Sequence, residues 1–220
     1  VYRIFVEKRN ILISGLLVLV GFYIVYIVKI YILLCFLPAA MLWISMQYLK
    51  SIRNQVIRWA IAPMILIISA GGGYYAVVKV GEENARYNIE SIAYTAEATA
   101  RWIHFVSERD GGSGYTLGDY DYSPAGVLRK TPAAIWVSLY RPYLWEVKNP
   151  VMLMSAMESA TFLMFTLWIL FRGGHRYLGN VFSDPLVAFC LVFAISFSFA
   201  VGLTTYNFGS LVRYKIPMLP

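Results

Sequence analysis

The sequence predicts an all-α, polytopic membrane protein with about five transmembrane helices and one extracytoplasmic segment between the third and the fourth. The first observation is the run of residues 11–49, which is apolar except for Lys29. A bilayer core about 30 Å thick is crossed by roughly 20 apolar residues. The second observation is composition: 59% of the residues are hydrophobic and 14% are charged, whereas soluble domains carry about 25% charged residues. An ordinary soluble domain is therefore excluded.

The first apolar run is too long for one span. As a single helix, residues 11–49 would extend for about 60 Å, twice the thickness of the bilayer core. We therefore predict two antiparallel spans, residues 11–28 and 30–49, joined by a tight turn at Lys29. The charge of Lys29 would then lie at the membrane interface.

Three further apolar runs complete the set of predicted spans: residues 59–80, 151–171 and 185–203. The third predicted span, residues 59–80, contains Gly71, Gly72 and Gly73 toward its end. Glycines weaken an isolated helix, but they allow the backbone of a neighbouring helix to approach closely. We expect this part of the span to pack against another helix.

Basic residues cluster beside three ends of the apolar runs: Arg3, Lys8 and Arg9; Lys50, Arg53 and Arg58; Arg172 and Arg176. With five spans, all three clusters fall on one side, which the positive-inside rule makes cytoplasmic. The clusters also account for the net charge of +7 without a nucleic-acid partner. The predicted organisation is a three-span region (1–80), an extracytoplasmic segment (81–150) and a two-span region (151–220) that we expect to continue beyond residue 220.

Residues 84–108 predict an amphipathic helix. Apolar residues recur on one face at helical spacing: Ile89, Ile92, Ala93, Ala96, Ala100 and Ile103. On another face Arg86 and Glu90, then Glu97 and Arg101, are spaced for i,i+4 ion pairs. The alanine-rich face suits a structural helix that lies over the spans, or contact with a partner or the membrane surface.

Asp119 and Asp121 follow a glycine-rich stretch, residues 111–118, that has neither the preceding strand nor the Lys-Ser/Thr of a P-loop. In an extended segment both carboxylates lie on one side, where they could hold a divalent cation or take part in sugar-phosphate binding. The alternative is that these carboxylates belong to a solvated, tyrosine-rich loop.

Residues 132–150 combine four aromatic side chains with charged ones: Trp136, Tyr140, Tyr143 and Trp145 with Arg141, Glu146 and Lys148. Such aromatics collect at the headgroup level. Because Pro142 and Pro150 interrupt the segment, we predict a short interfacial helix. The same mixture also suits a saccharide or lipid-phosphate ligand, since Arg141 could fork a phosphate and the rings could stack on a sugar.

Glu158 lies in the first third of the fourth predicted span, where a carboxylate is costly and normally faces protein or water. Its small neighbours favour a helix–helix interface, and a ligand or proton role is the alternative. His104 and His175 have no second ligand at metal-site spacing, so no metal site is predicted. Cys35 and Cys190 lie inside apolar runs, and no disulfide is expected.

The segment 204–220, Thr-Thr-Tyr-Asn-Phe-Gly-Ser-Leu-Val-Arg-Tyr-Lys-Ile-Pro-Met-Leu-Pro, resembles late-span segments of multispanning proteins linked to bacterial surface-polysaccharide assembly. The run Tyr140-Arg-Pro-Tyr-Leu-Trp-Glu is more loosely similar. Some of these proteins are GT-C glycosyltransferases, which use polyprenyl-phosphate sugars. The resemblance implies an inner-membrane location. The chain departs from the GT-C pattern because no acidic motif follows its first predicted span.

Three functions follow from these expectations. The first is a non-catalytic subunit or accessory of a cell-envelope assembly or export system, which needs no cofactor and has lipid and other membrane subunits as partners. The second is a GT-C-type enzyme for a polyprenyl-phosphate glycan, with Asp119 or Asp121 as base or cation ligand and Arg141 on the phosphate. In that case Tyr140, Tyr143 and Trp145 would line the ligand. The third is a transporter that uses Glu158 for coupling.

Overall fold

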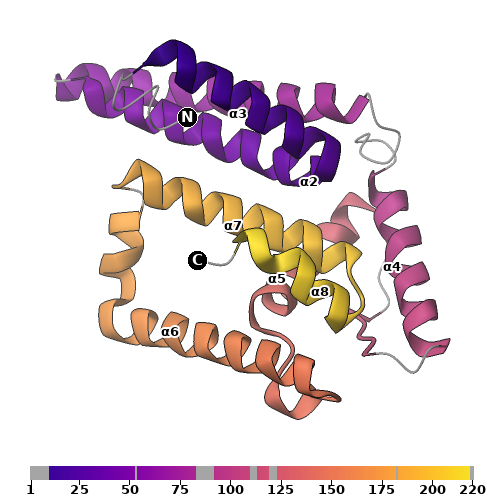
Figure 1. Ribbon diagram of the computed structural model, residues 1–220. Coiled ribbons are helices and arrows are strands. Elements are labelled where there is room, and N and C mark those ends of the chain that lie inside the picture. The colour runs from indigo at the N-terminus through magenta and orange to yellow at the C-terminus, as the bar shows by residue number, and fades with distance from the viewer. Residues whose placement is uncertain are drawn as a thin grey trace. The chain divides into compact units, whose positions relative to one another are not determined.

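The computed structural model of the chain describes residues 10–52, 54–82, 92–109, 113–118, 123–181 and 183–218. These residues form helices joined by short connections and contain no β-strand; the pair Gly114 and Asn207 makes an isolated antiparallel bridge. The predicted all-α class is therefore confirmed. The chain divides into two compact units, Val1–Val80 and Gly81–Pro220, which are described separately (Figure 1).

The first unit contains helices α2 (Ile11–Ser51) and α3 (Gln55–Glu82). Helix α2 is interrupted at Lys29, whose φ of −153° and ψ of 77° are not helical. The rings of Phe22 and Phe36 are 5.7 Å apart between centroids, although in a straight helix these residues would be about 21 Å apart. The second arm of α2 therefore folds back along the first (Figure 1). The predicted break at Lys29 is confirmed.

The glycine cluster at the middle of α3 allows a close helix contact. A Cβ atom added to Gly73 would lie 3.2 Å from the Cα of Pro38, and one added to Gly72 would meet the side chain of Met41. Pro38 and Met41 belong to the second arm of α2. The prediction that these glycines permit close backbone approach is confirmed.

Three helices in the described parts of the chain are long and apolar enough to cross a membrane: Leu12–Ser51, Pro150–Gly173 and Pro185–Thr204. Helix α3 contributes a shorter apolar stretch, Ala60–Ala76. Large apolar side chains on these helices are exposed, as expected for surfaces in contact with lipid; examples are Leu16, Leu19, Ile67, Phe165 and Leu186. These features are consistent with an integral membrane protein.

The second unit is built around α7. Its elements are α4 (Ile92–Arg109), α5 (Pro124–Tyr140), η1 (Leu144–Glu146), α6 (Pro150–Val181), α7 (Pro185–Thr204), α8 (Phe208–Lys215) and η2 (Ile216–Met218). Helix α7 contacts α4, α5, α6 and α8, and its most extensive contact is with α5. At that contact Gly202 lies so close to Ala134 that a Cβ atom would overlap the Ala134 backbone.

Local sequence signals start three of these helices. The side chains of Ser123, Asp184 and Asn207 accept hydrogen bonds from backbone N–H groups in the first turns of α5, α7 and α8, at 3.2, 2.8 and 3.2 Å. Such caps satisfy donors that have no partner inside the helix. Proline occupies the first position of α5 and of α7, where its missing N–H costs nothing.

The amphipathic helix predicted for residues 84–108 is α4, described from Ile92 to Arg109; residues 83–91 lie outside the described residues. Its alanine face is packed, with Ala100 fully buried and Ala96 and Ile103 partly buried. Arg101 and Glu97 form the predicted i,i+4 ion pair at 2.6 Å.

The helix predicted within residues 132–150 has other boundaries. Helix α5 begins at Pro124, passes through Pro132 and ends at Tyr140. Pro132 removes one backbone hydrogen bond from the helix. The face that includes Ala134 and Ser138 is buried in the unit core, and this packing outweighs the local signal of the proline.

Candidate functional site

The candidate site is a corner of the second unit where three segments meet: residues 113–118, 141–146 and 205–208. The backbone N–H of Tyr115 donates to the carbonyl of Tyr206 at 3.0 Å, and the N–H of Phe208 donates to the carbonyl of Ser113 at 2.9 Å. The Tyr115 hydroxyl donates to the carbonyl of Thr205. These bonds fix the first segment to the turn between α7 and α8.

Arg141 lies at the centre of the corner. Its guanidinium carbon is 4.9 Å from the ring centroid of Phe208, 5.2 Å from that of Tyr115 and 5.8 Å from that of Tyr143. Phe208 and Tyr115 are themselves stacked, with centroids 4.7 Å apart. Cations are attracted to aromatic faces at such distances, so the rings hold the guanidinium in place.

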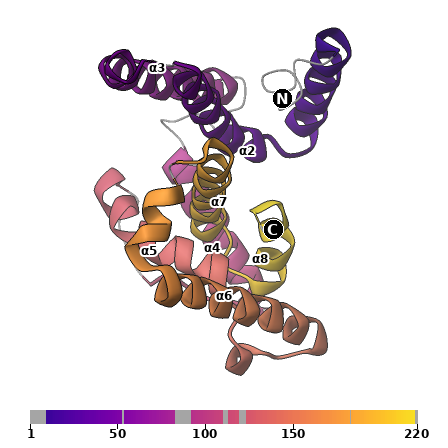
Figure 2. The same ribbon diagram turned by 90° about the vertical axis from the view of Figure 1, so that its left-hand side faces the viewer.

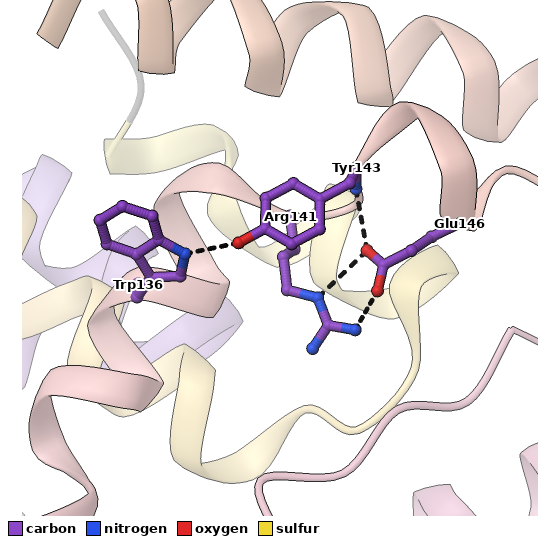
Figure 3. A network of polar contacts seen from close by, with 4 residues as sticks. All are labelled: Trp136, Arg141, Tyr143 and Glu146. Carbon is purple, nitrogen blue, oxygen red and sulfur yellow. Dashed lines mark hydrogen bonds and ion pairs between the residues drawn. The ribbon is translucent and has the colours of Figure 1, made fainter. Parts of the chain in front are cut away.

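The fork of Arg141 is occupied by Glu146 (Figure 3). Nε donates to Oε2 at 3.1 Å, and Nη2 is paired with Oε1. The Oε2 atom also accepts the backbone N–H of Tyr143 at 2.8 Å. The indole N–H of Trp136 donates to the Tyr143 hydroxyl at 2.6 Å. The ion pair between Arg141 and Glu146 therefore holds the connection between α5 and α6 in place within the corner.

Burial raises the pKa of the Tyr115 hydroxyl, and the positive charge of Arg141 opposes that effect. The phenol is therefore held in its neutral form, which is the form that can donate to Thr205. Its place in the corner is structural.

A second cation, Lys215, lies fully buried at the end of α8. Its Nζ donates to the Ser159 Oγ at 2.7 Å, and that hydroxyl donates in turn to the carbonyl of Arg141 at 3.2 Å. Burial lowers the pKa of Lys215, and the carboxylate of Glu158 acts in the opposite direction. This chain of bonds links α8 and α6 to the corner.

The geometry of α8 puts Lys215 beside the apolar part of α6. At 1.5 Å per residue, Ser159 lies about 13 Å along α6 from Pro150. Farther on, the Ser198 hydroxyl of α7 lies 2.9 Å from the Met218 sulfur. Helix α8 and η2 therefore turn back along α7. Sequence patterns did not predict this site, because a lysine in Arg-Tyr-Lys resembles any interfacial cation.

The aromatic residues that were predicted to line a ligand lie on two different surfaces of the second unit. Tyr140 packs against α6, with its ring 5.8 Å from that of Phe162. Tyr143 and Trp145 are stacked with centroids 4.7 Å apart, and Trp145 is 80% exposed. Of the four residues predicted to bind a ligand, Arg141 and Tyr143 meet directly in the corner.

Glu158 lies on α6 with its side chain exposed, whereas Ser155, Ala156 and Ser159 are buried. The small residues therefore form the packed face, as predicted, but the carboxylate itself points away from it. The physical reason is helical geometry: adjacent residues are about 100° apart around the axis, so Ser159 faces inward and Glu158 does not.

Asp119 and Asp121 lie outside the described residues. Next to them the segment 113–118 is fixed to α5 by Lys130, whose Nζ donates to the carbonyl of Leu117 at 2.7 Å. Over the portions of the chain that are described, no three His, Cys, Asp or Glu side chains gather in a way that could hold a metal ion.

Chemically, the charged and polar groups of the corner form hydrogen bonds with one another. The guanidinium has a carboxylate, the phenol has a carbonyl and the ammonium has a hydroxyl. No protein-family model, curated protein or solved structure matches the chain.

Proposed function

We propose that this chain is a non-catalytic integral subunit or accessory of a bacterial cell-envelope assembly or export system, related to polysaccharide. It would lie in the inner membrane, with lipid and other membrane subunits as partners. The observation that carries the proposal is the pairing of Arg141 with Glu146. The guanidinium that an enzyme would need for a lipid phosphate is engaged in holding the fold together.

The proposal includes five spans: the two arms of α2, then α3, α6 and α7. The break at Lys29 and the contact between Phe22 and Phe36 support two spans within α2. With this number, the basic clusters fall on the cytoplasmic side and residues 81–150 lie outside. Ser159, in the first third of α6, and Phe208, just after α7, both adjoin the Arg141 corner, which agrees with an antiparallel pair of spans.

A subunit role is also supported by the hydrogen bonds that the polar residues of the corner make within their own unit. Arg141, Glu146, Lys215 and Ser159 all bond to groups of the same unit. A protein that works by assembling with others needs such a rigid corner, while its surfaces are left for lipid and partners.

The test compares Arg141→Lys and Glu146→Gln with Arg129→Lys, an exposed control on α5. Lysine loses the two-point pairing and glutamine loses the negative charge, and a hydrogen bond to a charged group contributes about 1.5–3 kcal/mol. Both corner variants should therefore unfold at lower temperature in detergent, and the control should not. In the native host, the amount of assembled protein and the surface polysaccharide should fall together. Normal stability and assembly combined with lost sugar transfer would contradict the proposal.

The second candidate function is a GT-C-type enzyme that uses a polyprenyl-phosphate sugar. The observation that favours it is the position of the Arg141 guanidinium against the rings of Tyr115, Tyr143 and Phe208, a cation beside aromatic side chains. A phosphate could bind there only if it displaced Glu146 from the guanidinium. Asp119 or Asp121 would then supply a base or hold a divalent cation, and Tyr140 and Trp145 would contact the ligand.

Purified protein can distinguish the two functions through its binding of a polyprenyl phosphate. If the chain is an enzyme, it should bind the polyprenyl phosphate saturably, and the affinity should fall about tenfold or more in Arg141→Lys, because lysine keeps the charge and loses the fork. If the chain is a non-catalytic subunit, neither the wild-type protein nor Arg141→Lys should show saturable binding.

A further inference from the structure

Helix α4 carries an aromatic face opposite the one it packs with. Tyr94, Trp102 and Phe105 are 74%, 65% and 56% exposed. Their spacing places them on one side of the helix, and the rings of Trp102 and Phe105 are 6.2 Å apart. Ala100 and Ser107, on the opposite side, are buried. Three large rings are thus presented outward together.

Helix α4 is attached at the end of an apolar helix long enough to span a membrane. The side-chain amide of Asn207, just beyond α7, donates to the Ser107 hydroxyl at 2.8 Å. Figure 1 shows α4 running across the C-terminal end of α7, and in Figure 2 α7 is foreshortened toward the viewer. If α7 crosses the bilayer, its end lies at the bilayer surface. A helix that runs across that end lies close to the plane of the membrane.

A second group of exposed apolar side chains lies at the same end of the unit. Trp145 is 80% exposed and Leu144 is 52% exposed, shortly before α6 begins at Pro150. The Arg141 corner brings this connection next to the end of α7, because the guanidinium of Arg141 lies over the ring of Phe208. Both groups are therefore connected to the segment that follows α7: α4 through Asn207 and the connection before α6 through Phe208.

The chemistry of both groups is that of the membrane interface. Tyr and Trp concentrate at the headgroup level, because one part of each ring system is apolar and another is polar. On α4 the exposed Arg101 is paired with Glu97, so that part of the face carries no net charge. A face on which large rings make the contact suits a phospholipid headgroup layer of any charge.

We propose that α4 is an interfacial helix that lies in the headgroup layer, with Tyr94, Trp102 and Phe105 in contact with phospholipid. The exposed Trp145 and Leu144 contact the same layer. This inference goes beyond the proposed function, since a subunit and an enzyme could use the same anchor. It rests on the insertion of α6 and α7 in the bilayer.

The test uses spin labels on the full chain in phosphatidylcholine vesicles, with Cys35 and Cys190 replaced by alanine. Labels are attached to Phe105→Cys on α4, to Phe165→Cys on the exposed surface of α6 and to Ser51→Cys at the end of α2. Collision rates with oxygen and with a water-soluble nickel complex report depth. The oxygen-to-nickel ratio should be highest at residue 165, lowest at residue 51 and intermediate at residue 105.

Adding phosphatidylglycerol to the vesicles should leave the ratio at residue 105 unchanged. A ratio at residue 105 as low as that of a free spin label in buffer would place α4 in water and overturn the inference. Low collision rates with both reagents would mean that protein covers the face, and would overturn it as well. Trp102→Cys provides a second position if Phe105→Cys does not fold. A shallow ratio at residue 165 would instead show that α6 is not inserted, which is a failure of the proposed function.

Discussion

At the scale of single residues, Arg141 and Lys215 are placed differently from the cations of an open binding site. Arg141 is held by three rings and one carboxylate. Lys215 is fully buried with a serine hydroxyl as its acceptor. A buried ammonium with few acceptors is unstable unless something else compensates. Loss of the bond from Lys215 to Ser159 would therefore leave a buried ammonium without this acceptor.

The first residue-scale prediction concerns this link. Ser159→Ala removes the acceptor and leaves the ammonium buried, so stability should fall by about 1–3 kcal/mol. Lys215→Met fills a similar volume without a charge and should be close to neutral. The double variant should regain most of the loss, and thermal unfolding in detergent measures all three. An additive loss in the double variant would contradict the link, whereas lost function in a stable Lys215→Met would assign the charge a direct role.

At the scale of elements, close approach between helix backbones decides how each unit packs. Gly73 of α3 approaches Pro38 of α2, and Gly202 of α7 meets the backbone of Ala134 of α5. Small residues let membrane helices pack through backbone contacts where the hydrophobic effect between helices is weak. The glycines therefore define the helix contacts more than the large apolar side chains do.

Gly202→Ala should consequently weaken the contact between α5 and α7. The added methyl group overlaps backbone atoms that have no rotamer to change, so we expect a loss of about 1–3 kcal/mol. Gly71→Ala is the matched control, because a Cβ atom there meets nothing within 4 Å; it should keep or raise stability through better helix propensity. Equal unfolding temperatures for the two variants would show that the close contact is absent in the membrane.

At the scale of the whole molecule, the spans and the positions of the basic residues together set the orientation. Positive clusters beside membrane helices remain on the cytoplasmic side. The proposed five spans then place the Arg141 corner, with its bound segment 113–118, outside.

Ser113→Cys and Ser51→Cys test this orientation, in a background without Cys35 and Cys190. In intact cells a membrane-impermeant thiol reagent should label residue 113 and should not reach residue 51 until the membrane is opened. Labelling of residue 51 alone would reverse the orientation, and labelling of both residues would rule out the proposed number of spans between them.

The sequence by itself determined the helical class, the break at Lys29, the ion pair on α4 and the packed face of small residues on α6. Each of these depends on local order: a charge in an apolar run, an i,i+4 spacing, or a repeat of small side chains. Such patterns fix local structure because helical periodicity relates sequence distance to spatial distance.

Only the tertiary structure decided what the polar groups do. Glu146 occupies the fork of Arg141, and Lys215 reaches Ser159 on another helix. Helix α5 also continues through Pro132, although the predicted segment began at that residue. The packing of α5 on α7 outweighs the backbone hydrogen bond that the proline removes. The physical reason is that partner choice between distant residues depends on which helices meet, and the pairing energies appear only once packing has brought the groups together.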